Sequence, residues 1–378
     1  MTEIILSNAR LVLADEVVTG SLLVRDGRIA GIEPGSSRAG EDMEGDFVIP
    51  GLVELHTDHL EGHYAPRAKV RWDPVAAVLA HDAQIATAGI TTVFDALRVG
   101  NYDDADLAVE DMRKLADAIV DSVRGDRLRA DHFIHLRCEV SSPDCRDAFD
   151  HFIDDDRVRM VSLMDHAPGQ RQFARIETYA MYYMGRLKMS ESEFRIFCER
   201  RIAESTANSS ANRNLIAKAC AERGVILASH DDATVAHVGE AVAQGVRVAE
   251  FPTTQEAAKA SRQAGMGVLM GAPNVVRGAS HSGNVSARDL ASEGLLDILS
   301  SDYIPFSLIQ AAFSLSDVVD GITLPAAVAM VSKTPAESVG LADRGAIEIG
   351  RRADLVRVRL DDHVPVVRTV WRQGRRVA

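Results

Sequence analysis

An apolar segment near the start of the chain ends in two side chains that commonly bind metals. Residues 50–58 read Pro-Gly-Leu-Val-Glu-Leu-His-Thr-Asp, so that His56 and Asp58 are separated by one residue. In an extended strand, side chains at i and i+2 point to the same face, and both groups can then meet one ion. An imidazole nitrogen beside a carboxylate oxygen suits zinc, iron or manganese. Many surface strands carry such a pair by chance, so its meaning depends on whether the pattern recurs.

The pattern does recur, because later apolar segments also end at acidic or imidazole side chains. These strand-end groups are Glu139, Asp165, His166, His230, Asp231, Asp232, Glu250 and Asp302. Any one of them could cap a helix or form an ion pair. Together on one rim, they would repel each other or remain unsatisfied unless cations neutralised them. The sequence therefore predicts a metal centre.

Six of these residues are the predicted metal ligands: His56, Asp58, Glu139, His166, His230 and Asp302. Glu139 is predicted to bridge two metals. Asp302 is predicted to be the general base, since a carboxylate at the last strand can take a proton from water held at a metal. We expect two divalent ions, with zinc first and manganese or iron as alternatives.

The remaining histidines lack this spacing. His59 and His63 follow closely behind the first pair, and we expect them to support the site or to lie on the surface. The others are expected to be structural: His81, His132, His135, His151 and His363.

The elements that must position these groups alternate between strands and helices. Helical spacing of Leu107, Leu115, Ile119 and Val123 predicts a helix over residues 104–123, between two strands. The predicted buried strands are Leu52–His56, Ile90–Ala96, Phe133–Val140, Val158–Asp165, Val225–Ser229, Val246–Phe251, Gly267–Gly271 and Leu296–Ser301. Eight such strands over roughly 250 residues predict an α/β fold, a (β/α)8 TIM barrel, whose catalytic groups lie at the carboxyl ends of the strands.

The two ends of the chain are rich in β-forming residues and turn signals. We expect residues 1–50 and 340–378 to form one small β-sandwich domain, with Gly345–Ile349 as one of its strands. Residues 51–339 then form the barrel. The interval 167–224 exceeds what one crossover helix needs, which predicts a helical insertion over the barrel mouth.

Composition narrows the class of partner. Lys and Arg (42) minus Asp and Glu (55) give a net charge of −13, which argues against general binding to nucleic acid or a membrane surface. The four cysteines form no C-x-x-C pair, and the N-terminal residues show no secretory signal. The expected compartment is the cytoplasm.

The residues at the strand ends resemble those of the amidohydrolase superfamily. The resemblance rests on residues 50–58, His230, Ser301-Asp302 and the segment Gly-Ala-Ile-Glu-Ile-Gly-Arg-Arg-Ala-Asp-Leu-Val at 345–356. It implies a metal-dependent hydrolase whose barrel carries a split β-domain. The superfamily commonly has His-x-His where this chain has Asp58, and a histidine on its sixth strand where this chain has Glu250. Whether His166 or Glu250 replaces that ligand stays open.

Longer segments narrow this resemblance to the diphosphatases of the superfamily that act on a triphosphorylated ribose methylphosphonate. They cover residues 162–173, 228–234, 250–254, 271–284 and 300–303. The resemblance implies hydrolysis between the α- and β-phosphates, with release of pyrophosphate. Donors for an anionic small-molecule substrate are predicted in two loops: Gln170, Arg171, Asn274, Arg277, His281, Ser282 and Asn284.

Two other functions fit the same residues. A C–N hydrolase, either a sugar deacetylase or a cyclic amidase, would use the same metal centre. A metal-holding scaffold without catalysis is disfavoured, since structural metal sites are closed by four protein ligands, whereas this rim has surplus acidic groups. Homo-oligomerisation is compatible with the sequence and is not indicated by any motif.

Overall fold

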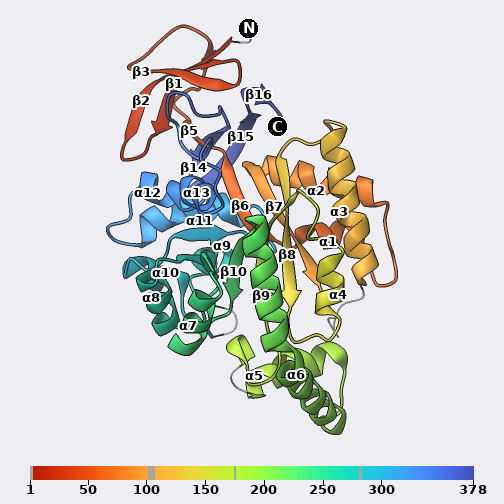
Figure 1. The fold of residues 1–378 in the computed structure, drawn as a ribbon. Coiled ribbons are helices and arrows are strands. Elements are labelled where there is room, and N and C mark those ends of the chain that lie inside the picture. The colour runs from red at the N-terminus through yellow and green to blue at the C-terminus, as the bar shows by residue number, and fades with distance from the viewer. Residues whose placement is uncertain (1–2, 101–106, 174–175, 281–282) are drawn as a thin grey trace.

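Eight parallel strands form one of two eight-stranded sheets in this computed structural model, which describes residues 3–100, 107–173, 176–280 and 283–378 (Figure 1). Their order in the sheet follows the sequence, and a bridge between Thr57 and Asp302 joins the last strand to the first. The strands are β6 (Leu52–Thr57), β7 (Ile90–Val99), β8 (Asp131–Glu139), β9 (Val158–Met164), β10 (Ile226–His230), β11 (Val248–Glu250), β12 (Gly267–Gly271) and β13 (Ile298–Ser300). The predicted (β/α)8 barrel is confirmed.

The strands form because they are rich in β-branched and other apolar residues that are buried on both faces. The inner face packs into a core that includes Val53, Leu55, Phe94, Met160 and Val248. Helices cover the outer face and add two larger apolar cores. Among the described residues, the helices are α1 (His59–Tyr64), α2 (Pro74–Thr87), α3 (Val109–Arg124), α4 (Cys145–Asp150), α5 (Ile176–Leu187), α6 (Glu191–Arg223), α7 (Val235–Ala243), α8 (Gln255–Gln263), α9 (Ala272–Arg277), α10 (Ala287–Ser292), α11 (Ser307–Val318), α12 (Leu324–Ala329) and α13 (Lys333–Ser338), with a 3-10 turn η1 (Arg171–Phe173).

The interval 167–224 contains η1, α5 and the 33-residue α6. A capping box at Ser190 and Glu193 begins α6, and Gly224 ends it in the left-handed conformation. In Figure 1, α5 and the first part of α6 lie at the end of the barrel opposite the second sheet, and the later part of α6 packs along the outside of the barrel through Ile216 and Cys220. None of the described helices combines the length and the apolar character that a membrane span requires.

Strands from both ends of the chain form the second sheet, in the order β16-β15-β14-β5-β1-β2-β3, with β4 beside β1. The central strand β5 pairs with β1 on one side and with β14 on the other, which joins the two termini. The strands are β1 (Glu3–Val12), β2 (Val17–Arg25), β3 (Arg28–Pro34), β4 (Glu41–Asp42), β5 (Phe47–Pro50), β14 (Leu355–Asp361), β15 (Val364–Arg372) and β16 (Arg375–Arg376). The predicted strand at 345–349 is wrong, because this segment forms turns whose Ile347 is buried against the sheet.

A partly buried ionic cluster connects the C-terminal segment to the barrel. Asp131, at the start of β8, accepts hydrogen bonds from Arg344 (2.8 Å), Arg352 (2.7 Å) and Arg372 (3.3 Å). Burial raises the pKa of Asp131, but the three guanidinium groups outweigh it and hold the pKa below its usual value. The cluster therefore stabilises the contact between the two sheets while Asp131 is ionised.

Candidate active site

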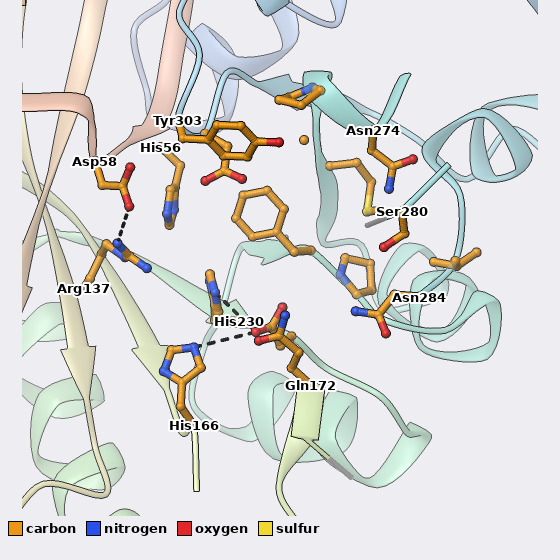
Figure 2. A pocket seen from close by; sticks show the side chains of 18 of the residues that line it. His56, Asp58, Arg137, His166, Gln172, His230, Asn274, Ser280, Asn284 and Tyr303 are labelled. Carbon is orange, nitrogen blue, oxygen red and sulfur yellow. Dashed lines mark hydrogen bonds and ion pairs between the residues drawn. The ribbon is translucent and has the colours of Figure 1, made fainter. Parts of the chain in front are cut away.

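A cavity of about 370 Å³ opens at the carboxyl ends of the barrel strands (Figure 2). Five of the six predicted metal ligands line it: His56, Asp58, His166, His230 and Asp302. Three of the predicted substrate-binding residues line it as well: Asn274, Arg277 and Asn284. Strand ends far apart in the sequence thus meet at one site.

A register irregularity in β6 presents His56 to the cavity. Glu54 pairs with Val93 and Thr57 pairs with Asp95, so β6 has one residue more than β7 in this interval. Such a bulge rotates the side chains that follow it. Asp58 lies beyond the strand, as the N-cap of α1, and makes no capping hydrogen bond. Its carboxylate instead accepts a 3.1 Å hydrogen bond from the Arg137 guanidinium.

Carboxylates hold the inner nitrogen of three cavity imidazoles. Glu250 is completely buried, and its two oxygens each lie 3.1 Å from an Nδ1 atom, one of His56 and one of His230. Glu139 holds Nδ1 of His166 at 2.6 Å. If each Nδ1 donates to its carboxylate, all three Nε2 atoms are left as lone-pair donors. This carboxylate–imidazole arrangement is the one that orients histidine ligands of metals.

The same contacts determine the pKa values of the two orienting carboxylates, Glu139 and Glu250. Burial raises the pKa of Glu139, but His166 outweighs it and lowers the pKa to about 2. Burial likewise opposes ionisation of Glu250, while His56 and His135 hold its pKa well below the usual value. Both orienting carboxylates are therefore charged at neutral pH.

The positions of Glu250 and Glu139 bear on the sequence predictions. Neither lines the cavity, because each is turned toward imidazole Nδ1 atoms. The sequence left open whether His166 or Glu250 replaces the histidine that the superfamily has on its sixth strand. The side chain of His166 reaches the cavity, and that of Glu250 does not. The bridging role of Glu139 stays a prediction, since its oxygens contact His166 and Ser141 here.

Three strand ends turn through the left-handed region at the cavity. Asp231, Phe251 and Asp302, the residues just after β10 and β11 and near the end of β13, have φ of 57°, 53° and 57°. Aspartate tolerates this conformation, whereas a bulky residue such as phenylalanine rarely adopts it. The Phe251 ring packs edge-on against His56 and His230, with centroids 5.1 and 5.2 Å apart. It forms an apolar wall beside the two imidazoles.

The carboxylate of Asp302 is suited to accept a proton near neutral pH. Burial, followed by the nearby Asp58 carboxylate, raises the pKa of Asp302 to about 6. The Asp231 carboxylate also lies beside the imidazoles, with Oδ2 3.5 Å from Nε2 of His230 and 3.8 Å from Nε2 of His166. The ligand atoms of His166, His230 and Asp231 lie within 4.8 Å of one another.

Amide, hydroxyl and guanidinium groups form the wall that faces the imidazoles. In Figure 2, Asn274, Ser280 and Asn284 lie across the cavity from His166 and His56. Oδ1 of Asn274 accepts a hydrogen bond from the Ala287 backbone, so its amide NH2 is the end available to a ligand. Arg277, Gln172 and Arg98 also line the cavity.

The remaining predicted substrate residues lie elsewhere. Arg171 is buried, donates hydrogen bonds to Asp232 and Glu240, and does not line the cavity. Gln170 is exposed and also lies outside the lining. His281 and Ser282 fall outside the residues that the structure describes. The roles predicted for these residues remain predictions.

Sequence reasoning gave no role to Arg137 or Asp231, both of which line the cavity, and missed the orienting role of Glu250. Arg137 is two residues before Glu139 on the same strand, so the period of two could have placed it at the site. Asp231 follows His230 directly and was noted as a strand-end acid without being assigned a role. The function of Glu250 depends on the simultaneous approach of two imidazoles from other strands, which no local pattern reveals.

The donor set at the mouth suits divalent metals. Imidazole nitrogens and carboxylate oxygens bind zinc, manganese and iron, and their inner atoms are already held by buried carboxylates. His56, His166 and His230, together with Asp58, Asp231 and Asp302, are the residues that would hold the ions.

Comparisons with known proteins identify the family of this chain. A family model described as the amidohydrolase family matches residues 202–378. The curated α-D-ribose 1-methylphosphonate 5-triphosphate diphosphatase of Escherichia coli (strain K12) is 48% identical over 377 residues, which cover 99% of this chain and 100% of that protein.

Solved structures share the fold at lower identity. N-isopropylammelide isopropylaminohydrolase from Burkholderia multivorans superposes with a TM-score of 0.66 at 16% identity, covering 100% of this chain and 98% of that chain. N-acetyl-D-glucosamine-6-phosphate deacetylase from Mycobacterium smegmatis gives 0.64 at 17% identity, with both chains covered completely. From the near-complete match to the diphosphatase and the barrel-mouth site, we conclude that the chain belongs to the amidohydrolase family, in the branch that contains this diphosphatase.

Proposed function

We propose that this protein hydrolyses the α–β phosphoanhydride of α-D-ribose 1-methylphosphonate 5-triphosphate, releasing pyrophosphate and ribose 1-methylphosphonate 5-phosphate. The 48% identity to the E. coli diphosphatase over the whole chain supports this substrate. C–N hydrolases among the solved structures are below 20% identical and support the fold alone.

One observation carries the proposal. Three carboxylate-held imidazoles and Asp302 line one side of the cavity, and Asn274, Asn284 and Arg277 line the other. The first side suits activation of water, and the second suits a chain of phosphate oxygens. A polyphosphate lying between them would present its α-phosphorus to the imidazole side.

The metal complement is part of the proposal. We assign two divalent ions, zinc by preference, to the imidazoles and carboxylates at the mouth. Such ions, when bound, lower the pKa of water to about 7 and polarise a phosphoryl oxygen. The enzyme is further proposed to act in the cytoplasm on this free small molecule.

The side chains of the protein perform the remaining steps. The carboxylate of Asp302 accepts the proton of the water whose oxygen attacks the α-phosphorus. The bond from that phosphorus to the bridging oxygen of the β-phosphate breaks, and pyrophosphate leaves with the bond electrons. Arg277 is placed to balance the charge of the leaving group, and the NH2 group of Asn274 is placed to donate a hydrogen bond to it. Phe251 limits access of bulk water to the imidazoles.

Product analysis with an Asp302 variant tests the proposal. Purified enzyme is incubated with the ribose triphosphate, and pyrophosphate and orthophosphate are quantified separately. The proposal expects one pyrophosphate per substrate, and a drop in kcat of about 10²- to 10⁴-fold in Asp302→Asn. The exposed Asp320→Asn serves as the matched control. Release of single orthophosphates, or cleavage of an N-acetyl sugar phosphate in its place, would reject the assignment.

A further inference from the structure

Three histidines outside the active-site cavity converge beside its first loop. His59 and His63 lie one turn apart on α1, and His81 projects from α2. One nitrogen of each lies within 4.8 Å of a nitrogen of the other two. None of the three lines the cavity described above. This group, called the trihistidine cluster below, was expected to consist of supporting, surface or structural residues.

The distances between the three imidazole rings are close to those expected around one tetrahedral zinc ion. Ring centroids are 5.0 Å apart for His59 and His63, 6.0 Å for His59 and His81, and 5.9 Å for His63 and His81. With a metal about 2.0–2.1 Å from each nitrogen in tetrahedral geometry, adjacent ring centres lie roughly 5 Å apart. A small movement of the rings toward each other would bring the cluster to that geometry.

Two buried nitrogens of the cluster have no hydrogen-bond partner among the described residues. His81 is fully buried, and its Nδ1 has no hydrogen-bond partner among the described residues. Nδ1 of His59 is likewise buried and without a partner there. Buried polar atoms are nearly always satisfied in native proteins, so both nitrogens call for a ligand.

Neighbouring groups already hold the outer nitrogens of two of the rings. Nε2 of His81 lies 2.8 Å from Asp95, a buried carboxylate that also binds Nδ1 of His132. Nε2 of His63 lies 3.2 Å from the amide oxygen of Gln84. A carboxylate or carbonyl behind a histidine fixes its tautomer and directs the other nitrogen at a metal.

Solvent reaches one side of the cluster. His59 and His63 are only partly buried, so water can reach a fourth coordination position.

We infer that the trihistidine cluster binds one divalent transition-metal ion, separate from the ions of the active site, and that this ion ties α1 to α2. Three imidazoles favour zinc over magnesium or calcium, which prefer oxygen ligands. Asp58 directly precedes His59, so an ion that fixes α1 also fixes the loop that carries this cavity carboxylate.

Metal stoichiometry tests the inference without relying on catalysis. The full-length protein is equilibrated at a fixed free Zn²⁺ concentration, and zinc per chain is measured for the wild type, His63→Gln, His230→Asn and the exposed control His363→Asn. We expect His63→Gln to lose one equivalent and His363→Asn to lose none. His230→Asn, altered at the active site, is expected to keep the equivalent that depends on His63. Equal zinc in wild type and His63→Gln would overturn the inference, as would loss of that equivalent in His230→Asn.

A milder variant keeps the test valid if His63→Gln does not fold. Gln84→Ala leaves all three imidazoles in place but removes the oxygen behind His63. Chelator competition is expected to show a zinc affinity about 10- to 100-fold weaker than in the wild type at this site. Replacement by Co²⁺ gives a second readout, in which one component of the ligand-field spectrum weakens with the same variant. Unchanged affinity in Gln84→Ala would overturn the inference.

Discussion

Replacement of Glu250 by glutamine is predicted to weaken metal binding at the active site without unfolding the barrel. The carboxylate accepts from Nδ1 of both His56 and His230, at 3.1 Å each, and Ser162 donates to it at 2.6 Å. Glutamine has the same size but only one acceptor oxygen, and its NH2 group cannot accept from the second imidazole. One of the two histidine ligands therefore loses its orienting partner.

The magnitude follows from the loss of one such contact. Removing the group behind a histidine ligand costs about 10- to 100-fold in metal affinity, which equals about 1.4 to 2.8 kcal/mol. Because the side chain is completely buried and its charge balances nearby imidazoles, a smaller part of the effect will appear as lower stability.

The assay compares zinc affinity by chelator competition in the wild type, Glu250→Gln and Glu256→Gln. Glu256 is exposed at the start of α8 and serves as the control for loss of one acid. Activity restored by excess Zn²⁺ would agree with weakened binding. Wild-type zinc affinity in Glu250→Gln, with an unchanged melting curve, would refute the orienting role of this carboxylate.

Three further predictions concern single positions. Asp131→Asn removes the carboxylate that pairs with three arginines, and it should lower the free energy of unfolding by about 2 to 3 kcal/mol. This is less than the usual cost of breaking a buried ion pair, because other acidic side chains remain near the arginines. Because the folded pKa of Asp131 is lowered, its contribution is present above the ordinary value of 3.8 and lost as pH falls, so urea melts of variant and wild type should converge below that pH. Arg137→Met should raise KM for the triphosphate about tenfold with a smaller change in kcat if the guanidinium binds phosphate, and equal kinetics would exclude that contact. Glu139→Ala should reduce metal per chain in elemental analysis, whereas two ions in both proteins would exclude the bridging role.

Much of the barrel could be predicted from the sequence because each strand is a short, continuous apolar segment. Segments such as residues 90–96 and 267–271 are recognisable by themselves, and a parallel sheet brings their carboxyl ends to one rim. His56, His166 and His230 were found for this reason. The mistaken strand at 345–349 shows the opposite case, where alternating apolar residues pack as turns against a sheet that both termini build.

Local sequence patterns did not predict contacts between side chains that are far apart in the sequence. Arg171 was predicted to bind substrate from its loop, but Asp232 and Glu240 from another part of the barrel pair with it. His81 was dismissed for lack of spacing, since its neighbours His59 and His63 are on another helix. Partners that meet only through tertiary packing leave no periodic signal.

Hydrolysis in ¹⁸O-labelled water tests the proposed reaction most directly. If water attacks the α-phosphorus, one ¹⁸O atom enters the 5-phosphate of ribose 1-methylphosphonate 5-phosphate, and the pyrophosphate remains unlabelled. Mass spectrometry of the two products at low conversion separates these outcomes, with Asp302→Asn as the reference for uncatalysed exchange. Label in the pyrophosphate, or in orthophosphate, would contradict attack at the α-phosphorus and with it the proposed orientation of the triphosphate in the cavity.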